Sequence, residues 1–191
     1  MYPNMSNNYG IGGFLGMVIP LVVVVLMDIL DNKIKSKQDL DKATKIPLAG
    51  IVGHNDKSSN LSVFSNPKSS IAESFRALRS SLDFFSPQLD DKGKIFVVTS
   101  SISGEGKTFC SINLASVLSL SGKKTVLIGV DLRKPKIYMD FDLSNQVGLS
   151  NYLVAQAELD EAIQSTKYPS LDLISAGPIP PNPSELLMSE K

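Results

Sequence analysis

The sequence contains very little cysteine and histidine, no tryptophan, and no excess of charge of either sign. The single cysteine, Cys110, excludes an internal disulfide and is typical of a reducing compartment for the soluble part of the chain. The single histidine, His54, excludes a zinc site built from cysteine and histidine. Basic and acidic residues number 19 each, so no global field favours nucleic acid as a partner.

Charge is also missing from residues 11–27, which hold a long apolar run. As a helix this run spans roughly 26 Å, a little less than the hydrocarbon core of a bilayer, and the two apolar residues after Asp28 lengthen it. No basic segment and no small-residue cleavage site marks a signal peptide. We therefore predict a transmembrane helix over residues 11–30, preceded by a polar segment at residues 1–10.

Lysines follow this predicted helix, and none precedes it. The positive-inside rule then predicts that the N-terminus lies outside and the rest of the chain lies in the cytoplasm. Residues 31–69 are expected to form a charged stalk and then a polar linker rich in serine and asparagine, over residues 54–69.

A helix is predicted over residues 70–85, because Ser70 and Glu73 form a capping box and apolar residues recur at steps of three and four. Glu73, Arg76 and Arg79 fall outside the apolar stripe. They suit either a solvated face with i,i+3 pairing or a contact surface for another subunit.

Residues 95–108 predict three elements in succession: a short apolar strand, a loop of small residues, and the start of a helix that runs to Gly122. This order is the context of a phosphate-binding P-loop, in which free loop amides and the helix dipole hold a phosphate chain. Lys107 is expected to reach the outer phosphates and Thr108 to complete the shell of a Mg²⁺ ion. The consensus opens with glycine where this chain has Ser101, so an ordinary strand–helix turn is the alternative.

A second apolar strand over residues 125–131 ends in Asp131. Strand, helix and strand at this spacing predict a right-handed βαβ unit in a parallel sheet. Ligands bind beyond the carboxyl ends of such strands, so Asp131 and the P-loop are expected to share one rim. A third strand over residues 171–175 and a helix that starts at Asn182 follow. The predicted fold is an α/β, P-loop NTPase-like parallel sheet flanked by helices.

Together these stretches resemble the bacterial tyrosine kinases (BY-kinases) fused to polysaccharide co-polymerases, the Wzc-like inner-membrane proteins of capsule and exopolysaccharide export. The resemblance is carried by the Walker A-like loop, the Walker A′-like segment, the Glu-x-x-Arg-x-x-Arg motif, the segment that precedes Walker B in the family, and the membrane helix with its charged continuation: residues 100–108, 130–135, 73–79, 176–187 and 11–40.

The resemblance implies an autokinase that uses ATP and Mg²⁺ to phosphorylate tyrosines, in trans, within a ring-like homo-oligomer at the inner membrane. It implies regulation of polysaccharide chain length and export, with polymerase and export proteins as further partners. Lys107 and Asp131 would be the catalytic residues, with Thr108 and Asp131 on the metal. The nucleotide would contact Ser103, Gly104, Glu105, Gly106, Lys107, Thr108 and Phe109, and the subunit contact would involve Glu73, Arg76 and Arg79.

The sequence departs from the family's pattern at Gly129, where the Asp-x-Asp-x-Arg motif has its first aspartate. Asp131 is then left alone for contacts with the metal and with the substrate hydroxyl. We also expect residues 70–191 to be an incomplete kinase domain, because the Walker B carboxylate and the tyrosine-rich tail are missing. The first membrane helix and the periplasmic domain of the family are missing too, so the chain is expected to be a fragment.

Three other functions remain open at this point. A scaffold that binds ATP without transferring phosphate is compatible with Gly129. A switch ATPase of the ParA/MinD type needs a second P-loop lysine, and this chain has Ile102 at that position. Asp131 could also be the Walker B residue of another P-loop class, although Arg133 and the closeness of this strand to the P-loop argue against it.

A reporter fused after Lys45 tests the predicted orientation. Because the lysines between Lys33 and Lys45 follow the apolar run, we expect a reporter that is active only outside the cytoplasm to stay inactive at this position. A reporter that works only in the cytoplasm should be active there. Activity of the first reporter would reverse the orientation.

Overall fold

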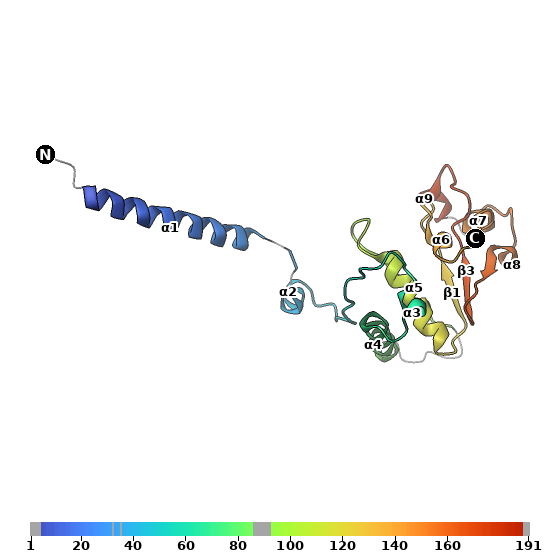
Figure 1. The fold of residues 1–191 in the computed structure, drawn as a ribbon. Coiled ribbons are helices and arrows are strands. Elements are labelled where there is room, and N and C mark those ends of the chain that lie inside the picture. Colours follow the sequence, from blue (N-terminus) through green and yellow to red (C-terminus); the bar gives the residue numbers. More distant parts are fainter. Residues whose placement is uncertain (1–4, 32, 35, 86–92, 189–191) are drawn as a thin grey trace. The chain divides into compact units, whose positions relative to one another are not determined.

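The computed structural model describes residues 5–31, 33–34, 36–85 and 93–188. The chain divides into two compact units, Met1–Pro47 and Leu48–Lys191. Figure 1 shows the order of the elements in both units, and each unit is described by itself below.

The first unit contains a long apolar helix, α1 (Met5–Leu30). Its stretch Tyr9–Leu30 has a mean hydropathy of 2.5 and is not buried against other parts of the chain, so it is long and apolar enough to cross a membrane. The helix begins earlier than the predicted span and continues through Pro20. Among the described residues it is the one helix with this length and composition.

The charged stalk forms a separate short helix, α2 (Lys37–Ala43). Ser36 starts it with a capping box, because its hydroxyl accepts the amide of Asp39 at 3.2 Å and the Asp39 carboxylate accepts the amide of Ser36 at 2.9 Å. These reciprocal bonds define the start of α2.

The second unit is built around a three-stranded sheet of order β1-β3-β2. Strand β1 (Thr125–Ile128) pairs in parallel with β3 (Leu171–Ile174), and β2 (Ile163–Ser165) pairs antiparallel with β3. The parallel pair and its flanking helices confirm the predicted α/β class. The helices of this unit are α3 (Ser62–Ser65), α4 (Ser70–Phe85), α5 (Lys107–Leu120), α6 (Ile137–Asp140), α7 (Leu149–Leu153), α8 (Leu159–Ala162) and α9 (Pro183–Leu186).

Helix α5 lies between the sheet and α4 (Figure 1). On one side, Ile112 and Ala115 join a buried cluster with Leu127 and Leu173 of the sheet. On the other side, its buried residues pack against α4 around Phe75, in a second buried cluster. The sequence of α5 is apolar around most of its circumference because both sides are covered.

The segment expected to be a polar linker, residues 54–69, contributes to the core. Leu61 and Val63 are buried in the two clusters that flank α5. Asn113 of α5 is completely buried and fixes this segment, because its side chain donates to the carbonyl of Asn60 at 2.7 Å and accepts the amide of Val63 at 2.9 Å. The stretch was predicted to be a linker because most of its residues are polar, but its two buried apolar residues pack it against α5.

The strand predicted over residues 95–99 is not formed. No strand is assigned to these residues, and Ile95 is 91% and Val97 is 84% exposed. A cavity of about 2050 Å³ is lined by this segment on one side and by residues 123–131 on the other. Ladder hydrogen bonds require strands about 4.8 Å apart, so an extended segment that faces a cavity instead of β1 forms no sheet.

Substitution of Phe75 tests the packing of α4 on α5. Phe75 is completely buried and its ring meets that of Phe109 edge to face, with centroids 5.8 Å apart. We expect Phe75→Ala to lower the free energy of unfolding by about 3–5 kcal/mol, because it leaves a cavity in a closed cluster. Urea denaturation of the full chain in detergent micelles, followed by tyrosine fluorescence, measures the change.

The matched control is Phe84→Ala, because Phe84 lies on the same helix and is 82% exposed. We expect that variant to stay within about 0.5 kcal/mol of the parent chain. Equal losses in the two variants would contradict the burial of Phe75.

Candidate functional site

Two glycines shape the loop that precedes α5. Gly104 has a φ of +92° and Gly106 a φ of +91°, in the left-handed region that side chains with a Cβ rarely adopt. A Cβ at either position would meet open space, so the backbone conformation alone requires glycine here. Gly106 is the residue before the first turn of α5 and directs the free amides of that turn toward the loop.

Lys107 folds back across this loop. Its ammonium group donates to the hydroxyl of Ser100 and to the carbonyl of Ile102, the latter at 2.9 Å. The Ser100 hydroxyl in turn donates to the same carbonyl at 2.9 Å. The lysine predicted to contact outer phosphates is therefore held by two oxygen atoms of its own loop, and Ser100 is a contact that the sequence pattern did not reveal.

Glu105 also binds the backbone of this loop. Its carboxylate accepts the amide of Ile102 at 3.1 Å. The pKa of the Glu105 carboxyl lies below its ordinary value, chiefly because of this amide, with smaller contributions from the Ser100 hydroxyl and the charge of Lys107. The carboxylate is thus stabilised in its ionised form by donors of the loop.

Asp131 occupies a turn that follows β1. One carboxylate oxygen, Oδ1, accepts the amides of Arg133 at 3.1 Å and of Lys134 at 3.0 Å. The residue is exposed, and neither of these hydrogen bonds involves its second oxygen, Oδ2. This turn orients the carboxylate without a second acidic residue.

The cavity beside β1 brings the predicted site residues together. Ser103, Lys107, Thr108 and Asp131 all line it, which places the start of α5 and the end of β1 around one space. Phe109 is different, because its ring packs into the core beside Phe75. Gly104, Glu105 and Gly106, also predicted to contact the nucleotide, are not among the residues that line this cavity.

The oxygen atoms at this cavity suit Mg²⁺ better than a transition metal. Magnesium binds with one or two protein oxygen ligands and completes its shell with water and substrate phosphates, and Thr108 and Asp131 provide that type of donor. Within the described ranges no group of three histidine, cysteine or acidic residues could hold a metal ion.

Gly129 lies where the related motif has an aspartate, and its surroundings are tight. A Cβ at this position would lie 3.0 Å from Cγ2 of Ile137 and 3.4 Å from the amide nitrogen of Ala176. Any larger residue would require Ile137 to move by a few tenths of an ångström. The side chains around Gly129 therefore favour glycine and leave Asp131 as the carboxylate of this turn.

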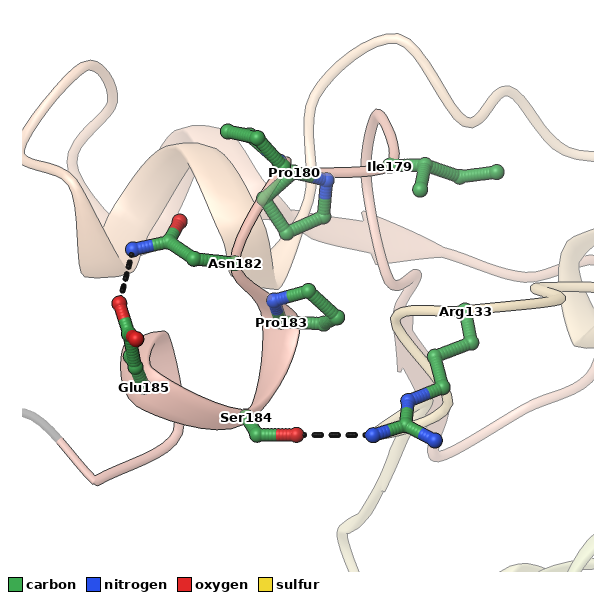
Figure 2. Close-up of a pocket in the computed structure, with 8 residues that line it drawn as sticks. Arg133, Ile179, Pro180, Asn182, Pro183, Ser184 and Glu185 are labelled. Carbon is green, nitrogen blue, oxygen red and sulfur yellow. Dashed lines mark hydrogen bonds between the residues drawn. The ribbon is translucent and has the colours of Figure 1, made fainter.

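A smaller cavity of about 540 Å³ lies between the Asp131 turn and the proline-rich segment before α9 (Figure 2). Arg133 spans it and donates to the hydroxyl of Ser184 at 2.9 Å. The proline-rich segment is fixed at its start, where the Ser150 hydroxyl donates to the carbonyl of Pro178 at 2.8 Å. The turn that carries Asp131 is thus connected to the segment that follows β3.

The three residues of α4 that were predicted to contact another subunit differ in their contacts within this chain. Arg76 forms an ion pair with Glu73 and donates to the carbonyl of Pro67 at 2.6 Å. No side-chain hydrogen bond or ion pair joins Arg79 to another described residue, and the residue is half-buried. Arg76 therefore stabilises the entry to its own helix.

The chain is similar in sequence and in fold to several known proteins. The chain is 40% identical over 131 residues to the tyrosine-protein kinase YwqD of Bacillus subtilis, an alignment that covers 69% of this chain and 54% of that protein. It is 31% identical over 210 aligned positions to the tyrosine-protein kinase etk of Escherichia coli K12, which covers 99% of this chain and 29% of that protein.

The solved BceF tyrosine kinase domain superposes with a TM-score of 0.72 at 34% identity, over 82% of this chain and 68% of that domain. No protein-family model matches the chain. The chain spans about half the length of YwqD and less than a third of etk. The sequence identity, the fold match and the predicted motifs agree, and the chain belongs to the bacterial tyrosine-protein kinases, the BY-kinases.

Proposed function

We propose that this chain is part of an ATP-dependent protein tyrosine autokinase of the bacterial inner membrane. Its role would be to regulate the chain length and export of a capsule or exopolysaccharide together with polymerase and export proteins. The observation that carries this proposal is the shared cavity, because Lys107, Thr108 and Asp131 line one space at the start of α5 and the end of β1. The kinase names of the relatives support the same reaction class.

The loop before α5 would bind the phosphates of ATP through its backbone. The free amides of the first helical turn and the positive end of the helix dipole favour an anion there. Lys107 would exchange its contacts with Ser100 and Ile102 for an outer phosphate oxygen. In that position its charge stabilises the charge that spreads over the transferred phosphoryl group.

Asp131 would act at the other side of the same cavity. With Thr108 it would hold Mg²⁺, which supplies positive charge to neutralise the phosphates. The two amides that bind Oδ1 keep the carboxylate in one orientation, so Oδ2 can contact the metal, a water or the tyrosine hydroxyl. When the tyrosine oxygen bonds to phosphorus, the bond from phosphorus to the ADP oxygen breaks, and Asp131 would accept the phenolic proton.

Self-association and membrane attachment complete the proposal. The helix α1 would anchor the chain with the N-terminus outside, because the lysines all follow it. Glu73, Arg76 and Arg79 would join neighbouring copies in a ring-like homo-oligomer, in which each copy phosphorylates tyrosines of the next. The side chain of Arg79, which has no partner among the described residues, supports this contact, whereas Arg76 also binds the carbonyl of Pro67.

A second candidate function is a scaffold that binds ATP and transfers no phosphate. The glycine at position 129 favours it, because the family's motif has a carboxylate there and a Cβ at this position would lie 3.0 Å from Cγ2 of Ile137. A ParA/MinD-type switch is disfavoured, since Ile102 stands where those proteins carry a second lysine and the Ile102 carbonyl binds Lys107 itself.

Substitution of Lys107 tests the kinase reaction. Incubation of the full chain in detergent micelles with Mg-ATP and a glutamate–tyrosine copolymer should produce phosphotyrosine, measured with radiolabelled ATP and an anti-phosphotyrosine antibody. We expect Lys107→Met to lower the rate about 100-fold, because it removes a charge that acts on the transferred phosphoryl group. Lys57→Met, at an exposed lysine outside the cavity, is the control and should keep the parent rate.

Nucleotide binding without phosphotyrosine in the parent chain would favour the scaffold. An equal rate in the parent chain and in Lys107→Met would contradict the role of this lysine.

Substitution of the two arginines separates self-association from stability. We expect Arg79→Ala to weaken self-association about tenfold and to change the free energy of unfolding by less than about 0.5 kcal/mol. Arg76→Ala should also lower the free energy of unfolding, by about 1 kcal/mol, because it loses the carbonyl of Pro67. Analytical ultracentrifugation and urea denaturation measure the two effects, and unchanged assemblies of Arg79→Ala would remove Arg79 from the interface.

A further inference from the structure

The loop before α5 contains its own anion. Glu105 lies in the middle of this loop, and its carboxylate accepts the Ile102 amide at 3.1 Å. Loop amides of this kind are the donors that a phosphate chain would need. We propose that Glu105 is an internal competitor of the nucleotide: its carboxylate occupies a donor of the phosphate-binding loop, and a polyphosphate binds by displacing it. This inference rests on the proposed nucleotide binding.

Lys107 binds the same residue as Glu105. Its ammonium group binds the Ser100 hydroxyl and the Ile102 carbonyl, so Ile102 is held through its amide by Glu105 and through its carbonyl by Lys107. The two charged side chains therefore act on one peptide segment. The positive charge of Lys107 also stabilises the Glu105 carboxylate and contributes to its lowered pKa. In this proposal both side chains leave Ile102 when a polyphosphate binds the loop.

The negative charge of Glu105 would lower the affinity of the loop for polyphosphates. A bound polyphosphate and the Glu105 carboxylate would both be anions beside the same amides and the same lysine, so they repel each other and compete for the same donors. Glu105 is exposed, and a displaced carboxylate can rotate into water at little cost. The side chain thus closes the loop and lowers its affinity for polyphosphates, and it is a positioning residue with no contact to the reacting atoms.

Nucleotide titration of Glu105→Gln tests this competition. Glutamine keeps the shape and an acceptor oxygen but removes the charge, and Glu105→Ala removes the acceptor too. For the full chain in detergent micelles with Mg²⁺, we expect both variants to bind a fluorescent ATP analogue roughly two- to fivefold more tightly than the parent chain. The gain should be smaller for the ADP analogue, which carries less charge, and should shrink as salt is added.

Amide hydrogen exchange gives a readout that needs no nucleotide. Because the Glu105 carboxylate protects the Ile102 amide, Glu105→Ala should accelerate exchange at Ile102 and leave the amides in the middle of α5 unchanged. Unchanged exchange at Ile102 in this variant would contradict the proposed contact.

The matched control is Asp160→Asn, which removes the same charge from an exposed residue of α8. It should bind the analogue as the parent chain does, and an equal gain in this variant would reduce the effect to net charge and overturn the inference. Equal or weaker binding by Glu105→Gln, with normal binding by the parent chain, would overturn the inference and leave the proposed function intact. Absence of binding by every form would contradict both.

Discussion

The burial of α5 on two sides is the constraint on which the rest of the structure depends. Its residues pack against the sheet on one side and against α4 on the other, in two separate clusters. A helix held in this way cannot rotate or shift without opening both clusters. Its first turn is therefore fixed in space, and with it the loop of Gly104 and Gly106, whose left-handed backbone turns the chain into the helix. The buried Asn113 adds the segment before α4 to the same unit.

Chemistry at the site depends on how a few charges are distributed around that fixed helix end. Both charged side chains bind the backbone of Ile102: Glu105 accepts its amide, and Lys107 donates to its carbonyl. Asp131 is oriented by the amides of its own turn, and Arg133 connects this turn to the segment after β3. Gly129 has no carboxylate where the family's motif has one, and its surroundings are tight. The loop thus presents amide donors and a lysine, and Asp131 adds a carboxylate oriented by its own turn.

Sequence patterns within a few residues correctly predicted the elements whose formation depends on neighbouring residues. The apolar run of α1, the apolar periodicity of α4 and the glycines before α5 each act within a few residues, and each was recognised from the sequence. The capping box predicted for α4 was wrong, because the hydroxyl of Ser69, and not that of Ser70, accepts the amide of Ala72 at 3.1 Å. The segment 95–99 shows the limit of such patterns, because its apolar residues are typical of a strand, yet a strand forms only where a neighbour completes its ladder. Residues 54–69 show the opposite error, since two apolar residues in a polar stretch were enough to dock it on α5.

The sequence by itself determined the class of the fold, the glycine loop before α5 and a helix long and apolar enough to cross a membrane, because periodicity, glycine and apolar length are properties of neighbouring residues. Only the tertiary structure decided that Phe109 belongs to the core, that Arg76 binds the carbonyl of Pro67, and that Ile137 crowds Gly129. It also decided that Lys107 and Glu105 both hold Ile102. These contacts depend on which donors and acceptors the folded backbone brings within about 3 Å of each other, and residue type and spacing leave that open.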